Sequence, residues 1–474
     1  MSWRQSAERF WTGPAGGREV ALVAYPLILG HLSFAIQTFI NRLFLTWYSA
    51  EAVAGAVTGL FAVWSLIALF TGTGEFLTTF IAQYFGAGRL ERIGGAVWQG
   101  IYFSIGAGAF IALLSPLAGP AFDLARHEPL LRRYEVEYAH ALMLGSFPVI
   151  LMATLSTFFA GRGETRVILY VNVLATFVNV VLDYVLIFGK AGFPELGVTG
   201  AALGTVVSQV AGAAVYLMLI LGRANREKYG TLASYRLEPW LVARLVRFGM
   251  PTGLQYALEV SAFAVFMVIV GRIGTLELAA SGIAFNLNMI VFFPMVGLAI
   301  GVSSLVGRYL GAEQPVLAER AVGSALRLSL VYMGLCGLLY VFGAPLLLAP
   351  YAAGADPATF PTVAAMATVL LRFVAFYSIF DMLNLIHAAG LRGAGDTTYS
   401  MLLTFVLGWI VMLVPAGIGC LYLGRGVYFA WWMATLYVFL LGLLMRRRFR
   451  AGHWKSLRVI ESAPLAVETG AVRP

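Results

Sequence analysis

The stretch QYFGA at Gln83–Ala87 decides the fold, because the chain repeats it. The same pattern, RYLGA, stands at Arg308–Ala312 in the second half of the sequence. Pro26 and Pro251 are separated by the same distance along the chain as these two stretches. Further identities occur at a slightly larger common spacing, namely Gly161, Gly163 and Thr165 against Gly393, Gly395 and Thr397. These matches keep one order along the chain, which indicates two homologous halves.

The composition places both halves in a membrane. Hydrophobic residues make up 60% of the 474 positions and charged residues only 12%, whereas soluble domains carry about 25% charged residues. A soluble enzyme is therefore excluded, and we expect no enzymatic activity and no cofactor. The net charge of +9 does not indicate nucleic acid, because the basic residues lie in short loops on one side of the predicted membrane. The two cysteines form no CxxC or Cys/His pattern, so neither a zinc site nor a disulfide framework is indicated.

Twelve apolar runs, bounded by charged residues, glycine or proline, predict twelve transmembrane helices of roughly 20 residues or more. They are 21–47, 53–81, 94–119, 138–160, 167–188, 198–222, 247–271, 278–306, 322–349, 361–389, 399–422 and 428–445. Each repeat holds six spans, so both repeats point the same way. We predict an all-α membrane protein with two six-helix bundles, related by a pseudo-two-fold axis along the membrane normal.

The charge distribution orients this bundle pair and divides the chain. Of the 32 Lys and Arg residues, 24 fall on the side of the two termini and eight on the other. The positive-inside rule then predicts a multi-pass membrane protein with both termini in the cytoplasm. The expected location is the plasma (bacterial inner) membrane. The expected units are a tail at 1–20, a lobe at 21–222, a linker at 223–246, a lobe at 247–445 and a tail at 446–474.

Four acidic residues, Glu75, Asp183, Glu259 and Asp381, lie inside the apolar runs. A carboxylate within lipid is costly, so such residues usually face a protein interior or a water-filled cavity and serve ion or substrate pathways. Glu259 lies on the order of 16 Å along its predicted span, near the bilayer midplane. It could bind Na⁺, take up a proton or pair with a cationic substrate; the alternative is a carboxylate that only hydrogen-bonds a neighbouring helix.

An ordered set of motifs resembles the MATE multidrug and toxin extrusion transporters of NorM type. The stretches that carry the resemblance are Ala82–Arg89, Val178–Gly189, Gly197–Thr205, Ile283–Asn286 and Leu391–Thr397. The resemblance covers roughly residues 20–448 and implies a cation-coupled antiporter that exports organic compounds or drugs.

The resemblance also implies a coupling-cation site in the C-terminal lobe, formed by Glu259, Asn286, Tyr377 and Asp381. Independently of the family, Tyr377 and Asp381 are four residues apart, which places them on one helix face. Carboxylate, amide and phenol oxygens suit Na⁺, and they equally suit a proton-binding site, so both coupling ions stay open.

A second site is possible in the N-terminal lobe. Asn179 and Asp183 repeat the four-residue spacing, and the resemblance implies that such a pair takes part in protonation together with an aspartate of the first span. This chain carries Asn41 at that position, followed by Arg42. One hypothesis is that Arg42 pairs with Asp183 as a fixed internal cation; the alternative is that Arg42 extends to the outer interface.

The remaining acidic residue, Glu75, follows Gly72-Thr73-Gly74 late in the second span, where a gate or cap role and a plain interhelical hydrogen bond are both open. No nucleotide-binding fingerprint is present, so an ion gradient is the expected energy source. The expected cargo is a bulky amphipathic organic compound, with cations as the expected class, and a monomer is the expected state. The rival functions are a lipid-linked saccharide flippase of the same superfamily and, from another class, an ion channel.

Overall fold

The computed structural model describes residues 10–123, 127–352 and 356–461, and every regular element in these ranges is a helix. Eleven of the described helices are long and apolar enough to cross a membrane. A bent pair of shorter helices, α7 (Pro129–Leu144) and α8 (Ser146–Ala160), completes a twelfth span. The predicted all-α membrane fold is therefore confirmed.

Six spans come from each half of the chain. The first half holds α2 (Gly17–Tyr48), α3 (Ala50–Glu75) continued by α4 (Leu77–Gly86), α5 (Glu91–Leu114), the α7–α8 pair, α9 (Thr165–Ile187) and α10 (Gly197–Ile220). The second half holds α12 (Pro239–Ile273), α13 (Thr275–Gly311), α14 (Pro315–Phe342), α16 (Phe360–Ala394), the segment from α17 to η3 (Thr397–Tyr422) and α19 (Val427–Arg450). Short helices α6 (Ala118–Asp123), α11 (Arg223–Tyr229) and α15 (Ala344–Ala352) lie in the connections.

Several helix ends differ from the sequence-based boundaries, among them the start of α12 and the end of α16. Helix α12 begins at Pro239, ahead of the predicted start at 247, because proline suits the first position of a helix. The predicted linker 223–246 therefore holds α11 and the first residues of α12. Helix α16 continues to Ala394 and ends where Gly395 adopts a φ of +95°, so Arg392 belongs to the helix and not to a loop.

Two spans are interrupted for identifiable local reasons. The α7–α8 pair bends by 49° at Gly145, where a Cβ atom would overlap the Val206 side chain of α10. The eleventh span contains two π-helical stretches on either side of Pro415. Proline has no backbone N–H and clashes with the preceding turn, which a local π adjustment accommodates.

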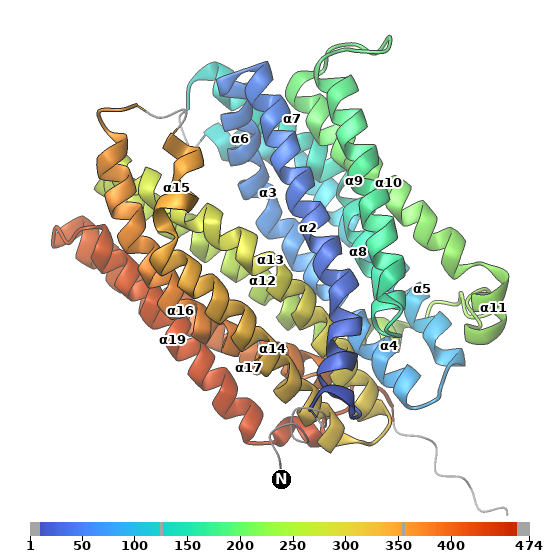
Figure 1. Cartoon of the computed structure of the whole chain (residues 1–474). Helices are drawn as coiled ribbons and strands as arrows, with labels where there is room; N and C mark the ends of the chain where they lie inside the picture. Colours follow the sequence, from blue (N-terminus) through green and yellow to red (C-terminus); the bar gives the residue numbers. More distant parts are fainter. Residues whose placement is uncertain (1–9, 124–126, 353–355, 462–474) are drawn as a thin grey trace, which may run out of the picture.

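The two halves form two bundles with matching internal contacts (Figure 1). In each bundle the second span packs on the fourth (α3 on α7, α13 on α16) and the third packs on the fourth (α5 on α8, α14 on α16). The fourth also packs on the sixth (α8 on α10, α16 on α19). The lobes meet through their first two spans, with α2 against α13 and α3 against α12. These paired contacts agree with the predicted pseudo-two-fold relation.

The repeated motifs meet each other at the lobe interface. A Cβ atom at Gly86 would overlap the Arg308 carbonyl oxygen, and a Cβ atom at Gly311 would overlap the Gln83 carbonyl oxygen. In the repeat, Gln83 corresponds to Arg308 and Gly86 corresponds to Gly311. The contact of Gly86 with Arg308 is therefore the symmetry equivalent of the contact of Gly311 with Gln83. The axis that relates the lobes therefore passes between the two motifs, and glycine permits the close backbone approach.

The lobes are closed at the end of the molecule where the described chain begins and ends, here called the terminal face. Hydrogen bonds cross the interface there from Thr79 to the Arg392 carbonyl oxygen (3.1 Å) and from Gln83 to the Gly393 carbonyl oxygen (3.1 Å). Ser304 likewise donates to the Ala160 carbonyl oxygen (2.6 Å). The described interlobe contacts thus hold this end shut.

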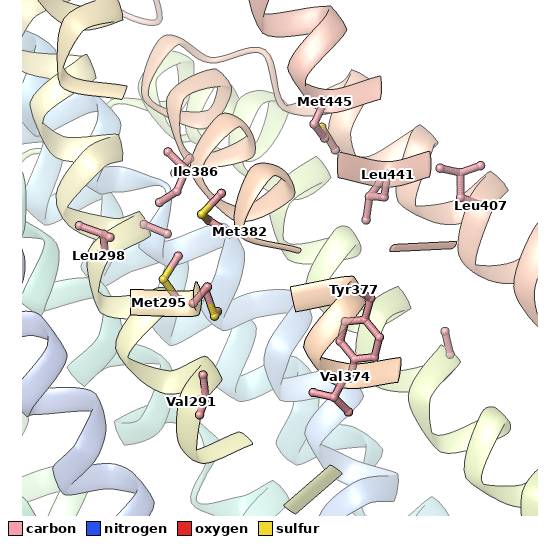
Figure 2. Close-up of a cluster of buried hydrophobic side chains, with 14 of the residues drawn as sticks. Val291, Met295, Leu298, Val374, Tyr377, Met382, Ile386, Leu407, Leu441 and Met445 are labelled. Atoms are coloured by element: carbon pink, nitrogen blue, oxygen red, sulfur yellow. The ribbon is translucent and has the colours of Figure 1, made fainter. Parts of the chain in front are cut away.

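The two lobes differ in the continuity of their cores. The C-terminal lobe has one buried apolar cluster, part of which Figure 2 shows with α13, α16 and α19 contributing side chains around Met295, Tyr377 and Leu441. The N-terminal lobe has two clusters, one towards the terminal face and one towards the opposite face. Residues of both clusters line a cavity in this lobe.

Candidate functional site

The C-terminal lobe gathers three of the four residues predicted to bind the coupling cation. Glu259 of α12 accepts a hydrogen bond from Gln255 one turn earlier (2.9 Å). Its carboxyl interacts electrostatically with that of Asp381 on α16. Tyr377 lies one turn before Asp381 on the same face of α16, and its side chain is only 5% exposed.

Further oxygen atoms complete this cluster. The Asn384 amide, on the turn after Asp381, lies within hydrogen-bonding reach of the Asp381 carboxyl. The Tyr437 phenol of α19 lies beside both Glu259 and Asp381. No Lys or Arg among the described residues forms an ion pair with either carboxyl. Two carboxyls, two phenols and two amides form an oxygen-rich set that suits Na⁺ or a proton. The Arg392 guanidinium acts on Glu259 electrostatically without forming a described ion pair with it.

Asn286 does not join this set in the structure. It lies on α13 with an exposed side chain, and no described hydrogen bond links it to the cluster. Conversely, the sequence interpretation missed Gln255 and Tyr437. Gln255 could have been found from its four-residue spacing to Glu259, whereas a single tyrosine in an apolar helix gives no signal of its own.

The second predicted site, in the N-terminal lobe, is assembled around Asp183 of α9. Asn41 of α2 donates to one carboxyl oxygen (2.9 Å), and Asn179 donates to the other (3.2 Å). Asp183 and Asn179 are fully buried. Gly204 of α10 leaves room for the carboxyl, since a Cβ atom there would overlap an Asp183 oxygen. Two neutral amides therefore satisfy this buried carboxyl group.

The hypothesis that Arg42 pairs with Asp183 is wrong for this structure. The Asp183 oxygens are occupied by the amides of Asn41 and Asn179. Among the described residues, no hydrogen bond, ion pair or cation–π contact occupies the Arg42 guanidinium, which instead lines a cavity. The neighbouring positions 41 and 42 point to different sides of α2, because adjacent helix residues differ by about 100° in direction.

That cavity has a volume of about 380 Å³ and lies within the N-terminal lobe, between α2, α3 and α7–α10. Phe293 of α13 and Arg392 of α16 bring the C-terminal lobe to its wall. The charged side chains that line it, among the described residues, are Arg42, Glu75 and Arg392. The C-terminal oxygen cluster is not part of its lining, so ion and substrate have separate candidate places.

Glu75 and Arg392 lie towards the terminal face of the cavity. Glu75 ends α3 at the break before α4, and no described residue hydrogen-bonds its carboxyl, so the expected interhelical hydrogen bond is absent there. Its electrostatic neighbour is Arg392, which donates to the Tyr256 hydroxyl of α12. Arg392 was counted as a loop cation in the sequence interpretation; the continuation of α16 moves it into the cavity wall.

The chain spans the membrane as two similar six-helix bundles. The bundles are closed against each other at one face and enclose a cavity. These features define a membrane transporter of the two-lobe class. The MatE family model matches this chain twice, at residues 26–185 and 251–416. The matches begin at Pro26 and Pro251, a pair that marks the internal repeat. The chain belongs to the MatE family, which confirms the resemblance drawn from its motifs.

Relatives cover almost the whole chain. A probable multidrug resistance protein NorM of Thermotoga maritima is 25% identical over 446 residues, 94% of each chain. A probable NorM of Rhizobium meliloti is 27% identical over 454 residues, 96% of each chain. Among solved structures, a MOP superfamily transporter from Pyrococcus furiosus, described as having a binding pocket of reversed polarity, aligns with a TM-score of 0.83. That alignment has 19% identity and covers 94% of this chain and 98% of the other, so it shows the fold.

Proposed function

We propose that this protein is a secondary active antiporter of the bacterial inner membrane, in which inward movement of Na⁺ or H⁺ drives export of amphipathic organic compounds. The observation that carries the proposal is the oxygen cluster around Glu259 and Asp381, two carboxyls inside a membrane lobe with no described ion-pair partner. The sequence-based count of Lys and Arg, 24 on the side of the two termini against eight on the other, supports a cytoplasmic position for the terminal face.

The separation of ion cluster and cavity supports alternating access. Three described interlobe hydrogen bonds lie at the terminal face, and a further one joins Ser261 to Ser65 farther along α12 and α3. Closure at the terminal face corresponds to an outward-open arrangement if that face is cytoplasmic. A cation that binds more tightly to this arrangement stabilises it by the difference between its affinities for the two states. A substrate that binds more tightly to the opposite arrangement would shift the lobes back to it. The cation and the substrate would then cross the membrane in opposite directions.

Efflux from proteoliposomes tests the proposal directly. The full chain is reconstituted with ethidium as probe, and efflux is followed under an imposed Na⁺ gradient and then under a pH gradient. We expect one of the gradients to drive efflux and Glu259→Gln to abolish the coupling. Glu51→Gln, an exposed carboxyl in the first turn of α3, is the matched control. Efflux under neither gradient would exclude antiport, and normal coupling in Glu259→Gln would exclude the cluster as the ion site.

The flippase alternative has weaker support. A saccharide pyrophosphate carrier is expected to line its cavity with several free cations. Here Arg392 is bonded to Tyr256 and faces Glu75, which leaves Arg42 as the one described guanidinium in the lining without a partner. Efflux coupled to an ion gradient, with no movement of a pyrophosphate-linked lipid probe, would separate the two functions.

A further inference from the structure

Arg42 lines the cavity and has no role in the proposed coupling of ion movement to export. It lines the cavity from α2, and no described residue supplies its guanidinium with a hydrogen bond, an ion pair or an aromatic face. Tyr138 of α7, a buried residue of the same lining, interacts electrostatically with both Arg42 and Asp183, and both Asp183 oxygens have amide donors. A guanidinium left unpaired at a protein cavity is a ready partner for an oxyanion, with a planar fork that matches a carboxylate.

An aromatic surface lies on the same side of α2. Phe34 stacks on Trp64 of α3 with ring centroids 6.4 Å apart and 25° between planes. It also meets Phe293 of α13 edge-on at 6.4 Å. All three rings line the cavity. Phe34 and Arg42 are eight residues apart, so their directions differ by about 80° at an axial separation of about 12 Å. Both side chains line the cavity.

The charge balance along the cavity is asymmetric. Towards the terminal face, Glu75 and Arg392 offset each other, and the Tyr256 hydroxyl occupies Arg392. Towards the opposite face, Arg42 has no carboxylate facing it in the lining. The aromatic surface lies between these two ends, so an amphiphile on the rings can direct an anionic group towards Arg42, the guanidinium of the lining that has no described partner.

We propose that Arg42 determines substrate selectivity, and that the cavity takes aromatic amphiphiles bearing a carboxylate, with the aromatic body on Phe34, Trp64 and Phe293 and the carboxylate on the Arg42 guanidinium. This inference rests on the proposed export function and names the substrate class of its cavity. It differs from the expectation that cations are the class of cargo, because Glu259, the carboxylate that could pair with a cationic substrate, does not line the cavity.

Equilibrium binding to the full chain in nanodiscs tests the inference without any gradient. The probes are dansyl-6-aminohexanoic acid and its primary amide, which share the aromatic body and the spacer and differ in charge. We expect Arg42→Gln to weaken binding of the acid by about tenfold or more, as for loss of one charge-assisted hydrogen bond. The affinity of this variant for the amide should differ from that of the wild type by less than about twofold, since the aromatic contacts of the amide remain. Arg42→Lys keeps the positive charge but not the planar fork, so it should retain part of the preference for the acid.

The control variant is Arg272→Gln, an exposed arginine in the last turn of α12 that lies outside the cavity; both probes should bind to it as to the wild type. Equal affinity of the wild type for acid and amide would overturn the inference. An equal loss of affinity for both probes in Arg42→Gln would also overturn the inference, because Arg42 would then only shape the cavity. Ethidium efflux under an ion gradient, measured on the same variants, tells these failures apart from failure of the export function itself.

Discussion

Buried carboxyl groups in the two lobes are held by different chemistry. In the N-terminal lobe, Asp183 has an amide donor on each oxygen and no exposure. In the C-terminal lobe, Glu259 and Asp381 are partly exposed, lie near each other and have one amide each. A carboxyl whose hydrogen bonds are complete stabilises the packing of its helices, whereas two incompletely bonded carboxyls side by side can accept a cation. The sequence showed which carboxyls lie in the membrane, but it could not show which had their partners.

Asn41→Ala tests the structural role of the N-terminal pair. The change removes the donor to one Asp183 oxygen and leaves a buried acceptor unsatisfied, so we expect a loss of about 1–3 kcal/mol in the free energy of unfolding. The measurement is thermal unfolding in detergent. Thr38→Ala, which removes a hydroxyl one turn earlier on α2 that bonds to its own helix, should change stability little. Wild-type stability in Asn41→Ala would show that water replaces the amide at Asp183.

Tyr437→Phe tests the phenol that the sequence did not predict. Its hydroxyl lies beside Glu259 and Asp381, so its removal should raise the coupling-ion concentration for half-maximal efflux several-fold, with little change in the maximal rate. Tyr428→Phe is the control, because Tyr428 is an exposed residue at the start of the same helix. An unchanged ion dependence in Tyr437→Phe would remove this residue from the cluster.

Among the helices, the spans were predictable from apolar runs, but their ends were not. The run GAG at 393–395 has the composition of a turn, yet α16 passes through its first two residues before Gly395 ends it. Packing decides this, because a Cβ atom at Gly393 would overlap the Ser303 carbonyl oxygen of α13. Glycine here serves close helix approach and not chain reversal. The functional consequence is Arg392, which a sequence-based boundary places in a loop and the helix places in the cavity wall.

Gly311→Ala tests the close approach of α13 to α4. The new methyl would meet backbone atoms of Gln83, which cannot move as a flexible side chain can, so the lobes must separate at the terminal face. We expect a destabilisation of about 1–3 kcal/mol, the usual cost of overpacking, seen as a lower thermal midpoint. Gly323→Ala on α14 has open space around the position and should be neutral or slightly stabilising. Equal midpoints for the two variants would contradict the tight motif contact.

For the whole molecule, the repeat predicted two bundles and their symmetry, but not how the C-terminal segment joins them. The residues after α19 cross from the C-terminal lobe to the N-terminal lobe at the terminal face. Val459 is fully buried in an N-terminal core cluster, and its amide donates to Gln83 (3.0 Å). Gln83 in turn donates to the Gly393 carbonyl oxygen of the other lobe (3.1 Å). No sequence pattern marks this segment, since its partners exist only once the lobes have closed.

The end of this segment is held by charge. Tyr84 donates to a Glu461 carboxyl oxygen (2.8 Å), Arg92 lies 3.4 Å from the other, and Arg89 donates to the Glu461 carbonyl oxygen (2.8 Å). Burial alone would raise the pKa of the Glu461 carboxyl, but hydrogen bonds from its own backbone amide and from Tyr84, with the charges of Arg92 and Arg244, lower this pKa below its ordinary value of 4.5. The ionised carboxyl therefore stabilises the contact above pH 4.5, and this contribution is lost as the pH falls further.

Glu461→Gln and Val459→Asp should both open the terminal face, because each weakens a contact made only when the lobes are closed. The measurement is the distance between spin labels at Ala224→Cys and Gln314→Cys, two exposed positions on opposite lobes at this face, with Cys336 and Cys420 replaced by serine. At neutral pH we expect both variants to show a larger population with a long distance than the wild type. Below pH 4.5 the wild type should approach Glu461→Gln, since protonation removes the same charge. Identical distance distributions in all three proteins at neutral pH would show that the lobes close without this segment, through the repeated glycine motifs and the other interlobe hydrogen bonds.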